Sequence, residues 1–170
     1  RHQGSCEINS VENLKSILQL KPEKEWNDFD VILCKPWSVS NVKKMKLIKR
    51  GFRSLLKDPS IFFNKNKQSI KLHFDMNHGH GNLEIAANLL PEKDKKDFID
   101  YVSTKTWLIG HCIFISKNKK IMDRFYNDLF SWLSNCEKIF GFKSNNYDTK
   151  RIYSFLTERY MPFWFEKYAK

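Results

Sequence analysis

Apolar positions along this chain follow two patterns, one typical of strands and one typical of helices. β-Branched apolar runs at 28–36 and 111–116 predict two strands, and the second run indicates burial on both faces. Helical spacing of apolar residues predicts six helices. These helices lie within residues 10–21, 42–56, 82–90, 94–101, 119–140 and 149–162. The pattern predicts an α/β or α+β domain with a helix-rich second half.

Residues that begin or end helices support these limits. Gly141 is a natural C-cap for the long helix over 119–140. Asp148 or Thr149 caps the last helix, and Pro162 should stop or kink it. Because the chain shows no internal repeat and no linker, we expect a single domain over residues 1–170.

The stretch Leu72–Glu84 holds three histidines and two carboxylates. We expect a loop here, either one that contacts a ligand or one that only caps the following helix. Its two glycines permit tight turns and a close approach of the backbone to a ligand. Such a loop can supply a general base and contacts to a phosphate or a sugar. The candidate catalytic residues are Asp75, His78, His80 and Glu84.

Two groups of residues also raise the question of a metal ion. Asp28 and Asp30 could share a divalent cation, but they precede a strand, whereas such a pair usually follows one. A second candidate set lies in the polar stretch and consists of His73, Asp75, His78 and His80. This second motif is weak because it lacks another ligand pair at standard spacing, so we assign no metal ligands.

Composition narrows the class of protein and of partner. Hydrophobic residues form 41% of the 170 residues and aromatics 15%, which excludes a disordered chain and predicts an aromatic core. The net charge of +11 favours anionic partners, namely nucleic acid, nucleotide phosphates or anionic lipid. A lysine-rich genome composition would give the same excess. The basic amphipathic segment 42–56 fits either an anionic membrane surface or an ordinary surface helix.

Cysteine usage and hydropathy bear on the compartment. The four cysteines are widely spaced and form no CxxC pair, which fits a reducing compartment with buried thiols. We see no signal peptide and no apolar run of membrane-spanning length. We therefore expect a cytoplasmic protein, with peripheral contact to the inner membrane surface as the alternative.

Five polar residues stand out within the apolar segment Trp107–Tyr168, where a plain core would not need them. Arginine forks bind phosphate or carboxylate in a bidentate manner, which suits Arg151 and Arg159 to a substrate. The adjacent Glu158 and Arg159 could equally form an ion pair that anchors the last helix. The five candidate substrate-binding residues are His111, Asp148, Arg151, Glu158 and Arg159.

An ordered set of short motifs runs from Phe29 to the C-terminus. It consists of Phe29–Pro36, His111–Ile115, Leu129–Leu133, Tyr147–Asp148 and Arg151–Arg159. Together they resemble a bacterial family of GT-A-like glycosyltransferases of capsular and exopolysaccharide synthesis, long catalogued as a domain of unknown function. Each motif alone is loose, whereas their order and spacing are more specific.

The resemblance implies sugar transfer from a nucleotide-sugar donor to a glycan acceptor in capsule, exopolysaccharide or lipopolysaccharide synthesis. It leaves the cofactor open, a divalent cation such as Mg²⁺ or Mn²⁺ being one option. It also implies a Rossmann-like relation, with this chain as the helix-rich C-terminal part and few strands. We therefore expect the chain to lack the family's N-terminal nucleotide-binding half. Gly110–His111 departs from the family, which usually has Asn at the start of that strand.

Two other functions compete with this interpretation. One is a basic, non-enzymatic binding module for nucleic acid or anionic surfaces, although no nucleic-acid motif is visible and the aromatics look buried. The other is an inactive remnant of a glycosyltransferase. The sequence leaves all three open and favours the enzyme.

Overall fold

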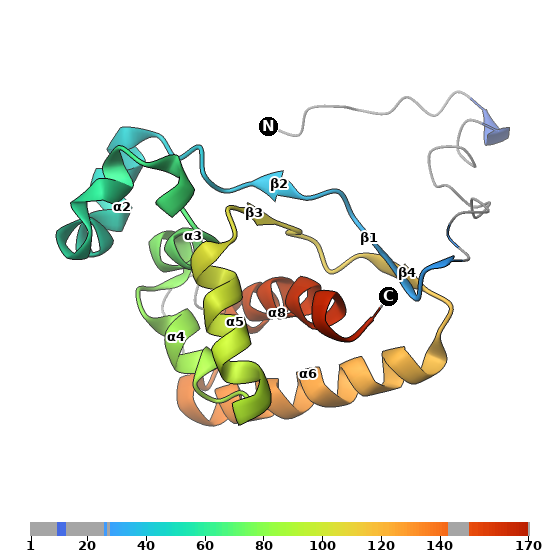
Figure 1. Cartoon of the computed structure of the whole chain (residues 1–170). Coiled ribbons are helices and arrows are strands. Elements are labelled where there is room, and N and C mark those ends of the chain that lie inside the picture. Colours follow the sequence, from blue (N-terminus) through green and yellow to red (C-terminus); the bar gives the residue numbers. More distant parts are fainter. Residues whose placement is uncertain (1–9, 13–25, 27, 143–149, 170) are drawn as a thin grey trace.

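The computed structural model describes residues 10–12, 26, 28–142 and 150–169. These residues form a mostly helical fold with two small two-stranded sheets (Figure 1). The strands are β1 (Val31–Leu33), β2 (Trp37–Ser38), β3 (Trp107–Leu108) and β4 (Phe114–Ser116). The helices are α2 (Lys44–Lys57), α3 (Ile70–His78), α4 (Asn82–Ala87), α5 (Glu92–Thr104), α6 (Lys119–Phe140) and α8 (Ile152–Tyr168). The expected helix-rich fold with few strands is confirmed.

The strands pair in antiparallel ribbons. β1 pairs with β4, with Val31 opposite Ser116, and β2 pairs with β3. The expectation that 111–116 is buried on both faces is wrong, because Ile113 and Ile115 are exposed. Each ribbon has only two strands, so one face stays open while Phe114 packs against the core. The free thiol of Cys112 is likewise exposed.

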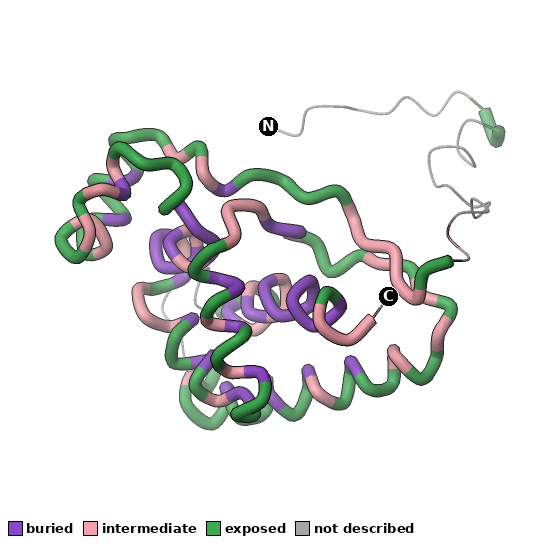
Figure 2. The backbone as a smooth tube through the Cα atoms, viewed as in Figure 1, coloured by how far each residue is buried: buried purple, intermediate pink, exposed green. Residues whose placement is uncertain are grey.

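Helix α8 runs through the middle of the molecule, between α5, α6 and the strands (Figures 1 and 2). All seven residues from Arg159 to Phe165 are buried, so the helix has no solvent face over two turns. Pro162 does not stop the helix, which continues to Tyr168. A proline inside a helix costs about 3 kcal/mol. Burying one large apolar side chain returns roughly 1.5–3 kcal/mol, and several such side chains flank Pro162.

Helix α6 confirms the predicted limits, 119–140, and its buried stripe comprises Phe125, Leu129, Trp132 and Cys136. Gly141 caps its C-terminus as expected. The indole of Trp132 donates to the Ala86 carbonyl at 2.7 Å, so α6 and α4 are joined by a buried hydrogen bond. The aromatic core expected from composition is therefore present, with this polar ring atom satisfied at its edge.

Helix α2 forms a separate small core with α3 and the 3₁₀ turn η2 (Pro59–Phe62). Its predicted basic amphipathic character is confirmed. Gly51 permits this packing, because a Cβ there would lie 3.2 Å from the Met76 sulfur. Residues 61–68, which lack a regular pattern in the sequence, contain the end of η2 and a second turn, η3 (Lys65–Lys67).

The stretch Leu72–Glu84 is not a loop, so that expectation is wrong. Most of it lies in α3, whose N-terminus is capped by the Ser69 hydroxyl, which accepts from the Leu72 amide at 3.4 Å. Gly79 and Gly81 have positive φ angles and make the turn into α4, which confirms their predicted role in a tight turn. The remaining residues continue into α4.

A buried carboxylate ties α5 to the end of α8. Asp94 is 1% exposed and accepts from the Lys167 ammonium at 2.8 Å and from the Tyr168 hydroxyl. Lys167 also contacts Asp97 at 2.6 Å. This network holds the C-terminal turn of α8 against α5.

Replacing Lys167 by Met should lower the free energy of unfolding by about 2 kcal/mol, because the buried Asp94 carboxylate loses its cation. Lys96→Met, an exposed change on α5, is the matched control and should stay within about 0.5 kcal/mol of the original protein. Urea denaturation at neutral pH measures both. Equal effects at the two positions would show that the network adds no stability.

Candidate functional site

A buried arginine joins α8 to α3. Arg159 is 1% exposed, and its Nη1 donates to Glu158 at 2.6 Å and to the Phe155 carbonyl at 3.1 Å. Its Nη2 lies 3.3 Å from His73 Nδ1, and its guanidinium lies over the Phe74 ring. Burial lowers the pKa of Arg159 to about 10, so the group stays charged at neutral pH. Its Nε has no hydrogen-bond partner among the described residues.

The contact with Arg159 fixes the protonation of His73. A guanidinium only donates hydrogen bonds, so Nδ1 of His73 must accept and the ring proton sits on Nε2. Burial lowers the pKa of His73 to about 4, and the positive charges of Arg159 and Lys46 add to the effect. The ring also meets the edge of Trp37, with ring centres 5.5 Å apart. His73 is thus a neutral acceptor at neutral pH.

His78 lies beside this pair. Its ring stacks on Phe155 with the ring centres 3.7 Å apart, and it meets Phe74 edge-on. Burial lowers the pKa of His78 to about 3, helped by the charge of Arg159. Its Nδ1 is buried without a hydrogen-bond partner among the described residues. The imidazole is therefore neutral and packs as an aromatic ring.

Glu158 is the carboxylate of this cluster. Burial raises the pKa of Glu158, while the neighbouring charges of Arg159, His111 and Arg151 partly offset that rise. Arg151 also lies over the Phe155 ring, 5.5 Å from its centre. His111 thus lies near the Glu158 carboxylate of α8 although the two residues are 47 positions apart in sequence.

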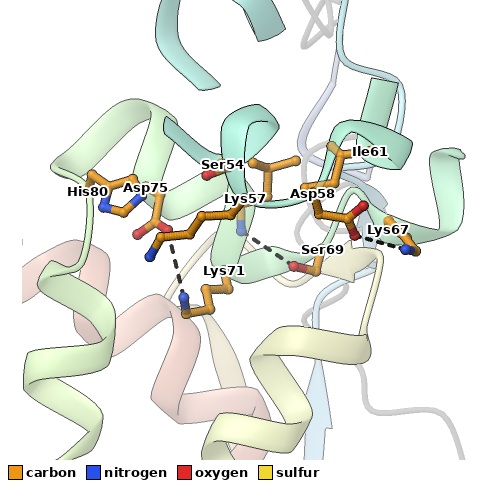
Figure 3. A pocket seen from close by; sticks show the side chains of 10 residues that line it. Ser54, Lys57, Asp58, Ile61, Lys67, Ser69, Lys71, Asp75 and His80 are labelled. Atoms are coloured by element: carbon orange, nitrogen blue, oxygen red, sulfur yellow. Dashed lines mark hydrogen bonds and ion pairs between the residues drawn. The ribbon is translucent and has the colours of Figure 1, made fainter. Parts of the chain in front are cut away.

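A second group of polar residues lies around a cavity of about 180 Å³ beside α2, α3 and the turn into α4 (Figure 3). Asp75 Oδ1 accepts from the Gly81 amide at 3.0 Å. Lys71 lies 3.1 Å from Glu84 and 3.9 Å from the other oxygen of Asp75. His80 also lines the cavity. Burial raises the pKa of Asp75, and the Gly81 amide and Lys71 partly offset that rise.

The structure divides the predicted catalytic residues between these two places. Asp75, His80 and Glu84 lie at or beside the cavity, whereas His78 faces α8. The predicted substrate-binding residues gather around Glu158, except Asp148, which lies outside the described residues. The predicted Glu158–Arg159 ion pair is present. Another cavity, of about 300 Å³ between α5 and α8, contains none of the predicted site residues.

No group of three or more His, Cys, Asp or Glu side chains in the described ranges is placed to hold a metal ion. Asp30, one member of the Asp-x-Asp pair, accepts from the Asn118 amide group at 2.8 Å and so ties β1 to the start of α6. The described side chains therefore form no ready-made protein cage for a cation, and Mg²⁺ is usually held by only one or two carboxylates together with substrate phosphates.

Two residues that contact Arg159, namely His73 and Phe155, were not predicted as its partners from the sequence. The sequence pattern suggests His73 only as a metal ligand, and it places Phe155 in the predicted last helix without any role at a site. The contact between His73 and Arg159 spans 86 positions, so no spacing in the sequence could reveal it. A helical interpretation of 70–78 would place His73 among apolar neighbours and suggest a buried partner.

The chain belongs to a family described as a domain of unknown function, DUF4422, whose model matches residues 15–169. Searches of curated proteins and of solved structures give no match. None of the described helices is both long enough and apolar enough to cross a membrane.

The lowered histidine pKa values predict a pH-dependent stability. Between about pH 6.5 and pH 4 the unfolded chain takes up protons on His73 and His78, whereas the folded chain does not. The free energy of unfolding is therefore highest above pH 6.5 and falls as the pH drops. Each histidine contributes a slope that approaches about 1.4 kcal/mol per pH unit.

The variant His73→Gln keeps an acceptor for Arg159 but does not titrate, so its stability should fall less between pH 7 and pH 5. Asn127→Gln, at an exposed position of α6 that carries no titratable group, is the control and should keep the original slope. Urea titrations at pH 7, 6 and 5 measure the slopes. A slope for His73→Gln equal to that of the unmodified chain would mean that the pKa of His73 is not lowered in the folded protein.

Proposed function

We propose that this chain is the C-terminal part of a glycosyltransferase that moves a sugar from a nucleotide-sugar donor to a glycan acceptor. The acceptors belong to capsule, exopolysaccharide or lipopolysaccharide synthesis. The observation that carries the proposal is the polar group at Glu158, which accepts from Arg159 at 2.6 Å and lies near enough to His111 and Arg151 for their charges to act on it. These are motif positions of the resemblance to GT-A-like enzymes, and the exposed His111 and Arg151 are not needed to compensate the buried Arg159.

The reaction sets two requirements on the site. The acceptor oxygen bonds to the anomeric carbon, the bond from that carbon to the diphosphate oxygen breaks, and the nucleoside diphosphate leaves with the electron pair. A base takes the proton of the acceptor hydroxyl. Positive charge stabilises the leaving diphosphate. The site therefore needs a carboxylate or imidazole beside space for the acceptor, and cations near the donor phosphates.

Asp75 fits the base better than the other candidates. Its raised pKa is closer to the operating pH than that of an exposed aspartate, which favours general-base catalysis. It lines a cavity to which Lys57 and Lys71 also contribute (Figure 3). His78 is a poorer base because its ring stacks on Phe155 and does not line this cavity. His80 and Glu84 remain candidates for acceptor contacts.

The Glu158 group then contacts the sugar hydroxyls. Arg151 and His111 are exposed and can reach a ligand, whereas Arg159 is buried. In this proposal Arg159 is a positioning residue that holds Glu158 through their 2.6 Å contact. The donor nucleotide binds to the half of the enzyme that the resemblance implies beyond this chain, so the activity belongs to the full-length gene product.

The substitution Asp75→Asn in the full-length gene product should lower kcat by about 100-fold or more, the usual loss when a general base is removed. The Asn oxygen can still accept from Gly81, so the turn stays intact. Release of nucleoside diphosphate from a panel of nucleotide sugars, with and without glycan acceptors, measures the rate. Asp100→Asn, an exposed carboxylate of α5, is the matched control.

Three outcomes would count against the proposal. If no nucleotide sugar binds the full-length product, the assignment as a glycosyltransferase fails. If Asp75→Asn keeps full activity, the base lies elsewhere. If oligonucleotides bind instead, with an affinity that falls steeply as salt rises, the basic binding module is the better assignment.

A further inference from the structure

Helix α2 has three distinct faces. One face is buried against α3 and η2 and includes Leu47 and Gly51. A second face is apolar and exposed, and a third is basic. An ordinary surface helix has only the buried and the polar face, so the exposed apolar face of α2 is the feature that needs an explanation.

The exposed apolar face follows helical spacing. Met45 is 63% exposed, Phe52 is 55% exposed and Leu56 is 68% exposed, and Ile48 lies between them on the same side. Just beyond η2, Phe63 is 82% exposed. Single exposed apolar side chains are common on protein surfaces, but a row along one helix face marks a surface that binds something apolar.

The basic face lies beside this row. Helix α2 contains six cationic residues and no acidic residue: Lys44, Lys46, Lys49, Arg50, Arg53 and Lys57. Arg50 donates to Asn77, and the Lys44 ammonium lies over the Phe62 ring, so neither contact neutralises a charge. The helix thus presents an apolar row next to a concentrated positive charge.

The position of α2 suits contact with a flat surface. It lies at one end of the molecule and packs on its small core, away from the main aromatic core (Figure 1). Its outer side is exposed along most of its length (Figure 2). The exposed row is therefore accessible over several helical turns.

We propose that α2 docks this chain on an anionic lipid bilayer. The row Met45, Ile48, Phe52 and Leu56 enters the interface between headgroups and acyl chains, while the lysines and arginines meet the lipid phosphates. A second copy of the chain is a poorer partner, because two such helices would place their positive charges together. Nucleic acid is also poorer, because aliphatic side chains gain nothing from phosphates or base edges.

This proposal rests on α2 and not on the proposed sugar transfer, so the two can fail separately. The full chain should sediment with vesicles made of equal parts of phosphatidylglycerol and phosphatidylcholine, and not with vesicles of phosphatidylcholine alone. Binding should weaken as salt rises, because the attraction is partly electrostatic.

Two pairs of variants separate the apolar from the basic contribution. Phe52→Ser with Leu56→Ser should lower the vesicle partition coefficient by about tenfold or more, because two inserted side chains are lost. Phe130→Ser with Ile139→Ser, in similarly exposed positions of α6, is the control and should leave binding unchanged. Lys49→Gln with Arg53→Gln should flatten the salt dependence, whereas Lys120→Gln with Lys138→Gln should not.

Circular dichroism shows whether each variant remains folded, and all eight positions are exposed, so folding should persist. Equal binding to neutral vesicles, or equal loss with the α6 control, would overturn the proposal. The proposal would also be overturned if light scattering showed a dimer that dissociates in Phe52→Ser with Leu56→Ser and the chain did not bind vesicles. Oligonucleotide binding without vesicle binding would also overturn it.

Discussion

The buried guanidinium of Arg159 is the interaction on which the centre of the molecule depends. Helix α8 is enclosed over residues 159–165, so a cation in this stretch has no water to solvate it. The charge is compensated by the Glu158 carboxylate, the Phe155 carbonyl, His73 Nδ1 and the faces of two aromatic rings. Without these partners, burial of α8 would leave the charge of Arg159 uncompensated. Helix α3 must therefore provide a neutral hydrogen-bond acceptor, which is His73.

That requirement shapes helix α3. Its side toward α8 carries His73, Phe74 and His78, which pack as rings, and both histidines stay neutral because they are buried beside a fixed positive charge. Its carboxylate, Asp75, is bound instead by the glycine turn and by Lys71. One cluster of histidines and carboxylates in the sequence is therefore divided by helix geometry into an aromatic side and a carboxylate side.

Helix α6 could be predicted to the residue, because an apolar stripe with helical spacing ends at a glycine. The antiparallel pairing between segments 28–36 and 111–116 could not be predicted from the sequence, because it depends on contacts between residues more than 80 positions apart. Helix α3 was not predicted, because its histidines and its aspartate, next to two glycines, suggested a loop. The tendency of Pro162 to end a helix was overestimated. Proline removes a backbone hydrogen bond, but burial of the surrounding aromatic side chains stabilises the helix enough to offset that loss. The candidate site residues are predictions from the sequence, and their division into two groups became visible only in the fold.

The two carboxylates, Glu158 and Asp75, differ in how much the stability of the fold depends on them. Glu158 balances a guanidinium that is 1% exposed, so its removal leaves a buried charge unpaired and weakens the fold as well as any function. Asp75 is held by one backbone amide and a partly exposed lysine, and an amide side chain can take over the bond to that backbone amide. A loss of activity at Glu158 therefore needs a stability measurement beside it, whereas a loss at Asp75 with unchanged stability points directly to chemistry in the cavity.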